Sequence, residues 1–435
     1  MSNVNPAAAD PTAILRLIQG SRAAREAGQI QEADQLLARA GQAAPGHPAV
    51  LNELGVQMLN RGDAAKAREL FQRAVQADPK HPSLWSNLAA SLDALGLLQE
   101  ELEAIDRALA LEPRHLASLL QKGTLIEAKG DARNAARAYR NALATIPPGA
   151  TPAPAVAAAV ARAREFVRAD DDALASAIEA KLGTIRSHHS GASTRRIDRC
   201  LDLVTGKRKR FNSEPTFMYF PELPAIDFFE RDEFPWLDAI EAGTEEIRNE
   251  LLTVLVADRA GLEPYIQYPD TVPLDQWREL NKSRRWSAYF LWNQSVPQQD
   301  HLARCPRTAQ LLKTAPQCDV TGRGPTAFFS ILEPHTEIPA HTGVTNTRLT
   351  VHLPLIVPPG CGFRVGSETR EWIPGKAWVF DDTVEHQAWN RSDSPRAVLI
   401  FDIWHPMLSP AERDLVRAAT EVVAEYYGSG SGSAL

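Results

Sequence analysis

A period of 34 residues runs through the N-terminal third of this chain and restricts its fold more than any other feature. Four glycines, four prolines and four alanines recur in one register at this period: Gly28, Gly62, Gly96, Gly130, Pro45, Pro79, Pro113, Pro147, Ala40, Ala74, Ala108 and Ala142. Glycine suits a tight turn, alanine a close helix crossing, and proline the end of a helix that it cannot continue. The pattern therefore predicts pairs of helices that stack along the chain.

The period and the helix–turn–helix pattern are those of the tetratricopeptide repeat, so we expect an α-solenoid of such repeats over residues 10–147. Stacked helix pairs curve and leave a concave groove, which favours a binding function for the array. A peptide or protein held in that groove is one interpretation. The other is that the array only dimerises the protein or covers the domain that follows.

One repeat departs from the pattern at a position where two helices should cross closely. Glu101 occupies a place that alanine fills in the other repeats, namely Ala33, Ala67 and Ala135. We expect this larger, charged side chain to loosen one crossing without breaking the array. The apolar stripe that stacks one helix pair on the next is predicted from three large residues on the first helices, Leu51, Trp85 and Leu119.

Charge and hydropathy exclude several classes of partner. The chain of 435 residues has a net charge of −7, so there is no global electrostatic case for nucleic acid or an anionic membrane. No apolar run approaches the roughly 18–20 residues that span a bilayer, and the first residues lack the features of a secretory signal. Four cysteines without CxxC spacing fit free thiols: Cys200, Cys305, Cys318 and Cys361. We expect a soluble, cytoplasmic protein.

Composition divides the remainder of the chain. A proline-rich stretch after the last repeat indicates a boundary. The alanine-rich segment from about Ala155 to Ile185 predicts one long helix or two short ones, as a helical connector over residues 148–195. We place a β-rich domain at residues 196–410, with its core at about 325–406, and a flexible tail at residues 428–435.

The β-rich segment alternates short apolar stretches with turn residues from about Pro325 onward, which predicts a sandwich or barrel. In NTRLTVHLPL the period is two, so Arg348, Thr350 and His352 should share one face of a strand. Leucine and valine residues between them should share the other face. Because an unpaired buried charge is expensive, a polar face inside a barrel suggests the lining of a polar cavity.

The histidines concentrate in this β-rich part. His341 and His386 each lie at the edge of a predicted strand, as do the two histidines of a metal site completed by one carboxylate. For His335 and His405 we favour core or surface positions without a ligand role. Asp381 and Asp382 precede His386; we interpret them as a turn-forming pair, with a ligand role as the alternative.

Three long motifs resemble the aspartyl/asparaginyl β-hydroxylase family: HTGVTNTRLTVHLPL, then GCGFRVGSETREWIPGKAWVFDDTVEHQAWN, then RAVLIFDIWHP. The resemblance covers roughly Trp286 to Pro406, and YFPELPAIDFFE is a possible N-terminal part of it. It implies a double-stranded β-helix, or jelly roll, with Fe(II) as cofactor, 2-oxoglutarate as cosubstrate and O2. The expected fold class is therefore α+β multidomain, with an N-terminal solenoid and a C-terminal jelly-roll domain.

The resemblance also implies roles for single residues. His341 and His386 match the two iron ligands, while Gly343 stands where other oxygenases have the third, carboxylate ligand; the family itself lacks that ligand. Residues matching the 2-oxoglutarate site are Ser330, His352 and Arg396, and residues matching the substrate site are Arg348 and Trp292.

The match to the family is incomplete at one position. Thr350 stands where the animal enzymes have an arginine near the cosubstrate. Any role of that arginine is absent here or is supplied by another residue, for which Arg364 is a candidate.

The resemblance implies an Fe(II)- and 2-oxoglutarate-dependent dioxygenase that hydroxylates a C–H next to a carboxylate or amide. The substrate would be an Asp- or Asn-type residue of a peptide or protein, an amino-acid-derived small molecule, or an acyl chain. One alternative is a repeat-based adaptor with a catalytically silent β domain. Another is a metal cupin that needs no cosubstrate, suggested by the spacing of His386 and Asn390. The intact set of His341, His386 and Arg396 argues against the adaptor, because a degenerate domain would be expected to lose some of the three. Arg396 also argues against the cupin, because an enzyme without cosubstrate has no need of it.

Overall fold

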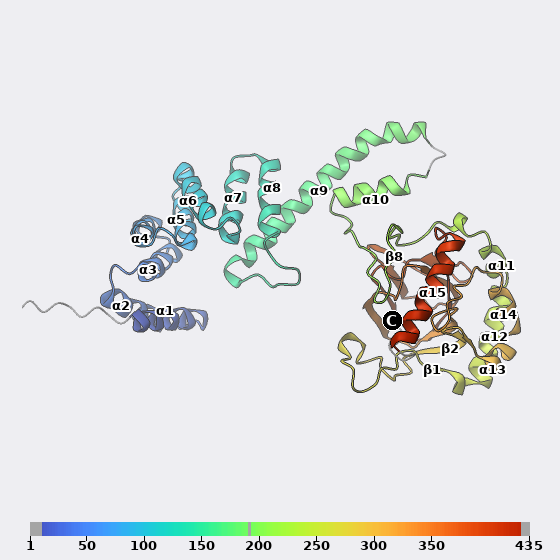
Figure 1. Cartoon of the computed structure of the whole chain (residues 1–435). Coiled ribbons are helices and arrows are strands. Elements are labelled where there is room, and N and C mark those ends of the chain that lie inside the picture. The colour runs from blue at the N-terminus through green and yellow to red at the C-terminus, as the bar shows by residue number, and fades with distance from the viewer. Residues whose placement is uncertain (1–10, 190–192, 428–435) are drawn as a thin grey trace, which may run out of the picture. The chain divides into compact units, whose positions relative to one another are not determined.

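The computed structural model describes residues 11–189 and 193–427, and the predicted tail at residues 428–435 lies outside them. The chain folds as two compact units, residues 1–205 and 206–435 (Figure 1). This division falls after the predicted start of the β domain at residue 196, because helix α10 (Arg195–Val204) belongs to the first unit. In the described ranges no helix is both long and apolar enough to cross a membrane.

The first unit begins with eight helices that pack as four consecutive pairs (Figure 1). Their bounds are α1 (Pro11–Glu26), α2 (Ile30–Ala43), α3 (Pro48–Asn60), α4 (Ala64–Ala77), α5 (Pro82–Ala94), α6 (Leu98–Leu111), α7 (Leu116–Ala128) and α8 (Ala132–Leu143). The repeat glycines lie in the turns inside the pairs with φ of 77°, 83°, 70° and 78°. The left-handed backbone at these turns explains why glycine recurs there. The predicted solenoid of tetratricopeptide repeats is confirmed.

Helix α9 (Pro154–His188) is a single long helix that extends beyond the last repeat. Its first half buries Val160 and Ala163 against the last helix pair, where Phe166 contacts the Tyr139 ring at a centroid distance of 5.3 Å. The N-terminal half of α9 therefore covers the apolar end of the array, as a capping element does in a solenoid.

Glu101 lies inside the helix crossing, as the repeat register predicts. Its side chain is 3% exposed, whereas the equivalent alanines are fully buried, and Oε2 has no hydrogen-bond partner within the described part of the chain. Burial raises the pKa of this carboxyl to about 7, with a further contribution from Asp93 and an opposing one from Lys129. The array therefore contains one buried acid that is best accommodated in its protonated form.

Replacing Glu101 by alanine should flatten the pH dependence of stability of the array. The folded-state pKa of about 7 exceeds the ordinary glutamate value of 4.5. The contribution of this group is therefore fully present below pH 4.5 and is lost as the pH rises through 7. At pH 8 we expect Glu101→Ala to raise the free energy of unfolding by up to about 3 kcal/mol.

Urea unfolding of the full chain at pH 5 and pH 8, followed by circular dichroism, measures this difference. Glu103→Ala changes an exposed carboxylate on the same helix and serves as the control. An equal pH slope in wild type and Glu101→Ala would contradict the assignment.

The second unit contains two β-sheets and several short helices. Its helices are α11 (Leu237–Ala242), α12 (Thr244–Ala257), α13 (Gln299–Arg304), α14 (Pro306–Leu312) and α15 (Pro410–Tyr427), with 3-10 turns at Arg231–Glu233, Arg259–Gly261 and Asp275–Trp277. Its strands are β1 (Glu263–Pro264), β2 (Trp286–Asn293), β3 (Val296–Pro297), β4 (Ala327–Leu332), β5 (Thr336–His341), β6 (Arg348–Ile356), β7 (Cys361–Val365), β8 (Glu368–Arg370), β9 (Trp378–Phe380), β10 (His386–Asn390) and β11 (Arg396–Trp404).

The strands form a seven-stranded and a four-stranded sheet, both antiparallel. The larger sheet has the order β1-β2-β4-β11-β6-β9, with β3 paired to β2, and the smaller sheet has the order β5-β10-β7-β8. Several neighbours in both sheets are distant in sequence, such as β4 with β11 and β5 with β10, as in a jelly roll. The predicted β-rich C-terminal domain is confirmed. Strands β1 and β2 lie upstream of the core that was expected at about residues 325–406. They nevertheless belong to the large sheet, because β2 pairs with β4 and β1 pairs with β2.

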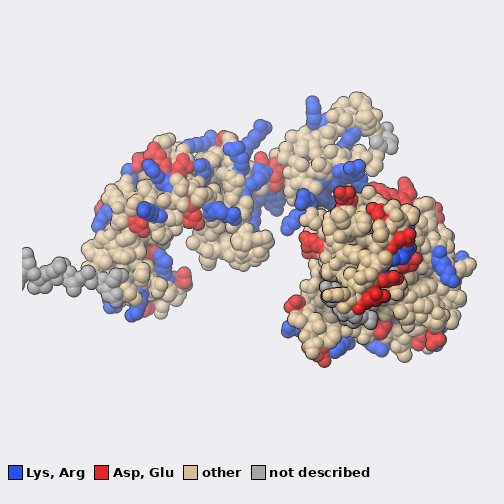
Figure 2. Space-filling view, viewed as in Figure 1, with Lys and Arg blue, Asp and Glu red and all other residues tan. Residues whose placement is uncertain are grey.

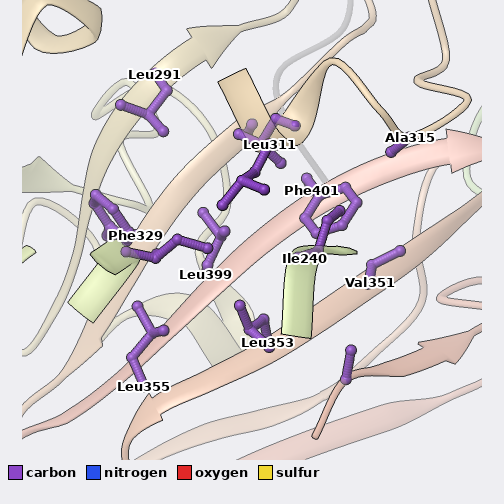
Figure 3. Packing of buried hydrophobic residues seen from close by; sticks show 14 of the residues in the cluster. Ile240, Leu291, Leu311, Ala315, Phe329, Val351, Leu353, Leu355, Leu399 and Phe401 are labelled. Carbon is purple, nitrogen blue, oxygen red and sulfur yellow. The ribbon is translucent and has the colours of Figure 1, made fainter. Parts of the chain in front are cut away.

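One face of the large sheet packs against helices α11, α12 and α14 through a hydrophobic cluster (Figure 3). Alternate residues of β6 and β11 point into this cluster, including Val351, Leu353, Leu399 and Phe401. The residues between them face the small sheet. The predicted separation of Arg348, Thr350 and His352 from the apolar residues of the same strand is therefore confirmed.

The space between the two sheets is only partly filled by apolar side chains. A second cluster there includes Phe363 and Val365 of β7, Phe380 of β9 and Val398 of β11. Helix α15 packs on this unit through Val416 and Thr420, which are buried. Figure 2 shows Asp and Glu side chains along the outer face of this helix. The four cysteines are free thiols, as predicted.

Candidate active site

A cavity between the two sheets brings together six of the residues predicted for the site. They come from five strands, β4, β5, β6, β10 and β11: Ser330, His341, Arg348, His352, His386 and Arg396. The remaining walls are largely aromatic or aliphatic, with Tyr265, Trp286, Phe363 and Phe380 among them. A mainly apolar cavity with a few convergent polar groups is the usual form of a small-molecule site.

The two histidines face each other across neighbouring strands. His341 at the end of β5 pairs with His386 at the start of β10, and their ring centroids are 4.1 Å apart. Each ring donates Nδ1–H to a backbone carbonyl, His341 to Pro339 at 2.8 Å and His386 to Val384 at 3.0 Å. Because a carbonyl can only accept, these bonds fix the tautomer and leave the Nε2 lone pair of both rings available.

Burial lowers the pKa of His341 to about 3, assisted by His386, and lowers the pKa of His386 to about 4. Both imidazoles are therefore neutral, which is the form that binds a metal ion. Among the described residues, no group of three or more His, Cys, Asp or Glu side chains is placed to hold a metal ion. The donor set is thus an adjacent pair of neutral histidines.

The third ligand position of an ordinary two-histidine, one-carboxylate site is closed by sterics. A Cβ atom built on Gly343 would overlap the carboxylate of Asp382. Asp382 follows β9, lies buried in the same cavity, and leaves Oδ1 without a hydrogen-bond partner in the described chain. Burial raises the pKa of this carboxyl, while Arg348 and a hydrogen bond from Thr350 lower it. A carboxylate therefore lies beside the histidine pair, and it is contributed by Asp382 instead of by residue 343.

Arg396, at the start of β11, also lines the cavity. Its side chain is 1% exposed, Nη1 lies 3.4 Å from Ser330 Oγ, and the guanidinium stacks on the Trp372 ring at 4.8 Å. No ion pair joins it to a carboxylate in the part of the chain that the structure describes. Burial lowers the pKa of Arg396 to about 10. A buried cation without a protein counter-charge is expensive unless a ligand anion completes it.

Other polar groups around Arg396 also lack partners. Within the described ranges, Arg396 Nε, His352 Nδ1 and Trp372 Nε1 are buried without a hydrogen bond. Trp286 donates Nε1–H to Ser330 Oγ at 3.1 Å, which leaves the Ser330 hydroxyl proton to be donated elsewhere. Burial lowers the pKa of His352, and the nearby Arg396 lowers it further. These donors fit a carboxylate placed between them.

The sequence profile of the family described as aspartyl/asparaginyl beta-hydroxylase matches residues 241–406, the segment that builds this cavity. Residues 241–406 form a domain of the aspartyl/asparaginyl β-hydroxylase family. A second profile, described as tetratricopeptide repeat, matches residues 24–92.

Several relatives share the hydroxylase-family domain. Aspartyl/asparaginyl beta-hydroxylase of Homo sapiens is 38% identical over 141 residues, which are 32% of this chain and 18% of the relative. Aspartate beta-hydroxylase domain-containing protein 2 of Homo sapiens is 32% identical over 205 residues, which are 46% of this chain and 53% of the relative. Ornithine lipid ester-linked acyl 2-hydroxylase of Rhizobium tropici is 36% identical over 181 residues, which are 41% of this chain and 60% of the relative. The matches thus span between about a fifth and three fifths of these relatives.

One solved structure is similar to part of this chain. A thermophilic TPR protein of Thermus thermophilus has 20% sequence identity and a TM-score of 0.32, with 37% of this chain and 88% of that chain covered.

Two residues predicted for the hydroxylase-domain site lie outside the cavity. Trp292 packs against the hydrophobic cluster under the helices, because an irregularity in the β2–β4 register between Phe290 and Trp292 reverses the alternation. Arg364, suggested as a substitute for the missing arginine, donates instead to Glu385 at 2.7 Å and to the Gly366 carbonyl at 2.6 Å.

Three other polar residues from the sequence analysis, Asn390, His335 and His405, make contacts outside the cavity. Asn390 donates to the carbonyls of Leu332 and Ser394 and ties the β10–β11 turn to β4. His335 is exposed beside Asp393, and His405 is buried against the Phe229 ring. None of these three histidine or asparagine side chains lines the cavity.

The structure adds residues to the hydroxylase-domain site that the sequence motifs did not reveal. Trp372, Trp286 and Asp402 contact predicted site residues directly: the Arg396 guanidinium, the Ser330 hydroxyl and the Arg348 guanidinium, respectively. A period-two count along the last strand would have placed Asp402 on the same face as Arg396. Nothing local in the sequence marks the two tryptophans.

Restoring a carboxylate at Gly343 should destabilise the hydroxylase-family domain and should not create a third metal ligand. The new side chain of Gly343→Asp must displace the Asp382 carboxylate, and overpacking of this kind costs about 1–3 kcal/mol. Urea unfolding followed by tryptophan fluorescence measures the loss.

A matched double variant tests the cause. Adding Asp382→Ala to Gly343→Asp removes the overlapping carboxylate and should restore part of the lost stability. A single variant as stable as wild type, or no recovery in the double variant, would refute the steric explanation.

Proposed function

We propose that this chain is a hydroxylase that depends on Fe(II), 2-oxoglutarate and O2. One observation carries the proposal: a buried arginine without a protein carboxylate among the described residues, Arg396, shares a cavity with two neutral, tautomerically fixed histidines, His341 and His386. An anion site and a metal-type site in one apolar cavity match the needs of a cosubstrate that is both a chelator and a dicarboxylate.

His341 and His386 are the residues that would hold Fe(II), through their Nε2 atoms. When bound, Fe(II) with 2-oxoglutarate and O2 supplies an oxidant for an unactivated C–H bond, and 2-oxoglutarate is converted to succinate and CO2. The backbone carbonyls of Pro339 and Val384 keep the rings in place for this task. Phe363 and Phe380 pack on the His386 ring and exclude water from that side.

Arg396, Ser330 and His352 are proposed to bind the distal carboxylate of 2-oxoglutarate. Arg396 supplies the charge, Ser330 a hydroxyl oriented by Trp286, and the stacked Trp372 ring keeps the guanidinium in its plane. Because the arginine is buried, the ion pair would form in a low-dielectric surrounding and exclude solvent from the reacting end.

Arg348 is proposed to bind the substrate. It lines the cosubstrate cavity and also an adjoining cavity whose walls include Phe217, Phe290 and Val416. A guanidinium at this junction suits a carboxylate or amide oxygen next to the carbon that is hydroxylated. The names of the relatives fit one chemistry, since an aspartyl or asparaginyl β-carbon and an acyl 2-carbon both adjoin a carbonyl carbon.

The repeat array is proposed to bind the peptide or protein that the hydroxylase-family domain of the same chain hydroxylates. Helical repeats present extended concave surfaces that suit peptides. Under this proposal the substrate is an Asp- or Asn-type residue of a bound peptide, and a free amino-acid derivative would not need the array. Comparing turnover of a peptide and of the free amino acid separates the two.

The purified chain with Fe(II), ascorbate, 2-oxoglutarate and air should form succinate, because oxygenases of this type turn over slowly without substrate. His386→Ala should abolish it. Arg396→Gln should weaken 2-oxoglutarate binding by about 100-fold or more, since it removes a buried charge-assisted contact. Succinate is measured by chromatography and binding by calorimetry.

The control for these variants is Arg391→Gln, which changes an exposed arginine after β10 and should leave both measurements unchanged. If the Fe(II)-loaded protein neither bound 2-oxoglutarate nor formed succinate, the adaptor interpretation would replace this proposal. Metal-dependent turnover that Arg396→Gln did not affect would instead indicate an enzyme without cosubstrate.

A further inference from the structure

One end of the Arg348 guanidinium is tied to the protein, and the other is not. Nη1 donates to Asp402 Oδ2 at 3.0 Å and to the Arg323 carbonyl at 3.1 Å. Nε is buried without a hydrogen-bond partner among the described residues. The guanidinium edge formed by Nε and Nη2 therefore remains for a ligand, and this edge can bind a carboxylate with two parallel hydrogen bonds.

Asp402 is itself held rigidly. It lies on β11 facing the small sheet, its side chain is 5% exposed, and both carboxylate oxygens accept from the Thr326 backbone N–H at 3.2 Å. Gly324 packs next to this carboxylate: a Cβ there would lie 3.3 Å from Asp402 Oδ2 and only 2.3 Å from the Cys318 carbonyl oxygen. The carboxylate thus has one position, and it fixes the position of Arg348 Nη1.

Stability alone does not explain the pair. A buried ion pair contributes little to folding compared with apolar residues of the same size, because both charges lose their hydration. Burial raises the pKa of Asp402 to about 7, and only Arg348 and the Thr326 N–H oppose that rise to a notable extent. Burial lowers the pKa of Arg348, but Asp402 and Asp382 outweigh it and keep the guanidinium charged. The fixed position that Asp402 gives to Arg348 Nη1 is a reason for such a pair.

We propose that Asp402 is a positioning residue that anchors Nη1 of Arg348 and so aims its Nε–Nη2 edge at the carboxylate or amide oxygen of the substrate. The inference rests on the proposed function in so far as Arg348 binds substrate. It adds Asp402, whose role is to orient the Arg348 side chain. An alternative role, in which Asp402 merely attenuates the charge of Arg348, predicts the opposite effect on ligand affinity.

Nuclear magnetic resonance of the full chain with 15N-labelled arginine tests the anchoring directly. Arg348→Lys identifies the Arg348 signals. In the wild type, rotation about the Cζ–Nε bond should be slow and the Nη1 and Nη2 signals separate. In Asp402→Asn the charge-assisted bond is lost, and the two signals should merge.

Two further variants separate geometry from charge and from general damage. Asp402→Glu keeps the negative charge but moves the carboxylate by one methylene, so positioning predicts that it behaves like Asp402→Asn, whereas attenuation predicts wild-type behaviour. Asp319→Asn removes the carboxylate partner of Arg417 on the surface and should leave the Arg348 signals unchanged. If Asp402→Asn folds poorly, Asp402→Glu is compared with Asp319→Asn instead, and the test still decides.

Acetate serves as the carboxylate probe. Titration should shift the Arg348 Nε signal in the wild type, and the dissociation constant should rise about tenfold in both Asp402 variants, the loss expected when one of two parallel hydrogen bonds is misaligned. Resolved Nη signals in Asp402→Glu, or tighter acetate binding in Asp402→Asn, would overturn the proposal. Uncoupled succinate formation is measured alongside in the wild type and in the control Asp319→Asn, in which it should be unchanged. Its absence from the wild type would reject the proposed function, while the Arg348 signals would still decide the role of Asp402.

Discussion

The antiparallel pairing of β6 with β11 is the constraint on which the second unit depends. Residues 348–356 and 396–404 lie side by side through the middle of the large sheet. Because side chains alternate along both strands, one register sends one set of residues into the hydrophobic core under the helices. The same register sends Arg348, His352, Arg396 and Asp402 toward the small sheet. A slip of one residue would exchange the two sets and leave neither the core nor the cavity.

The cavity is stabilised by the apolar frame around it more than by its own polar groups. Arg396 and the unpartnered donors near it in the described chain are costly to bury, and the cluster of Phe363, Phe380 and Val398 lies beside them. Such an arrangement is expected where a protein binds an anion, since the ligand then compensates the buried charge. The histidine pair follows the same logic, because burial keeps both rings neutral and the carbonyl bonds keep one nitrogen of each ring free.

Periodicity in the sequence predicted the parts of the fold that local interactions determine. The turn glycines, the buried alanines and the position of Glu101 follow from a fixed repeat, since each repeat contacts only its neighbours. The two faces of β6 follow from the period of two along a single strand. The resemblance of the motifs added the expectation that His341 and His386 act together, and the structure places them opposite each other.

What the sequence determined by itself was therefore the repeat array, the β-rich domain and the faces of single strands. Only the tertiary structure decided which side chains meet across strands. A register irregularity turned Trp292 away, Arg364 found an acceptor on a neighbouring segment, and Asp402 reached Arg348. The physical reason is that local pattern fixes the direction of a side chain relative to its own strand. Register, bulges and the packing of two sheets fix what that side chain contacts.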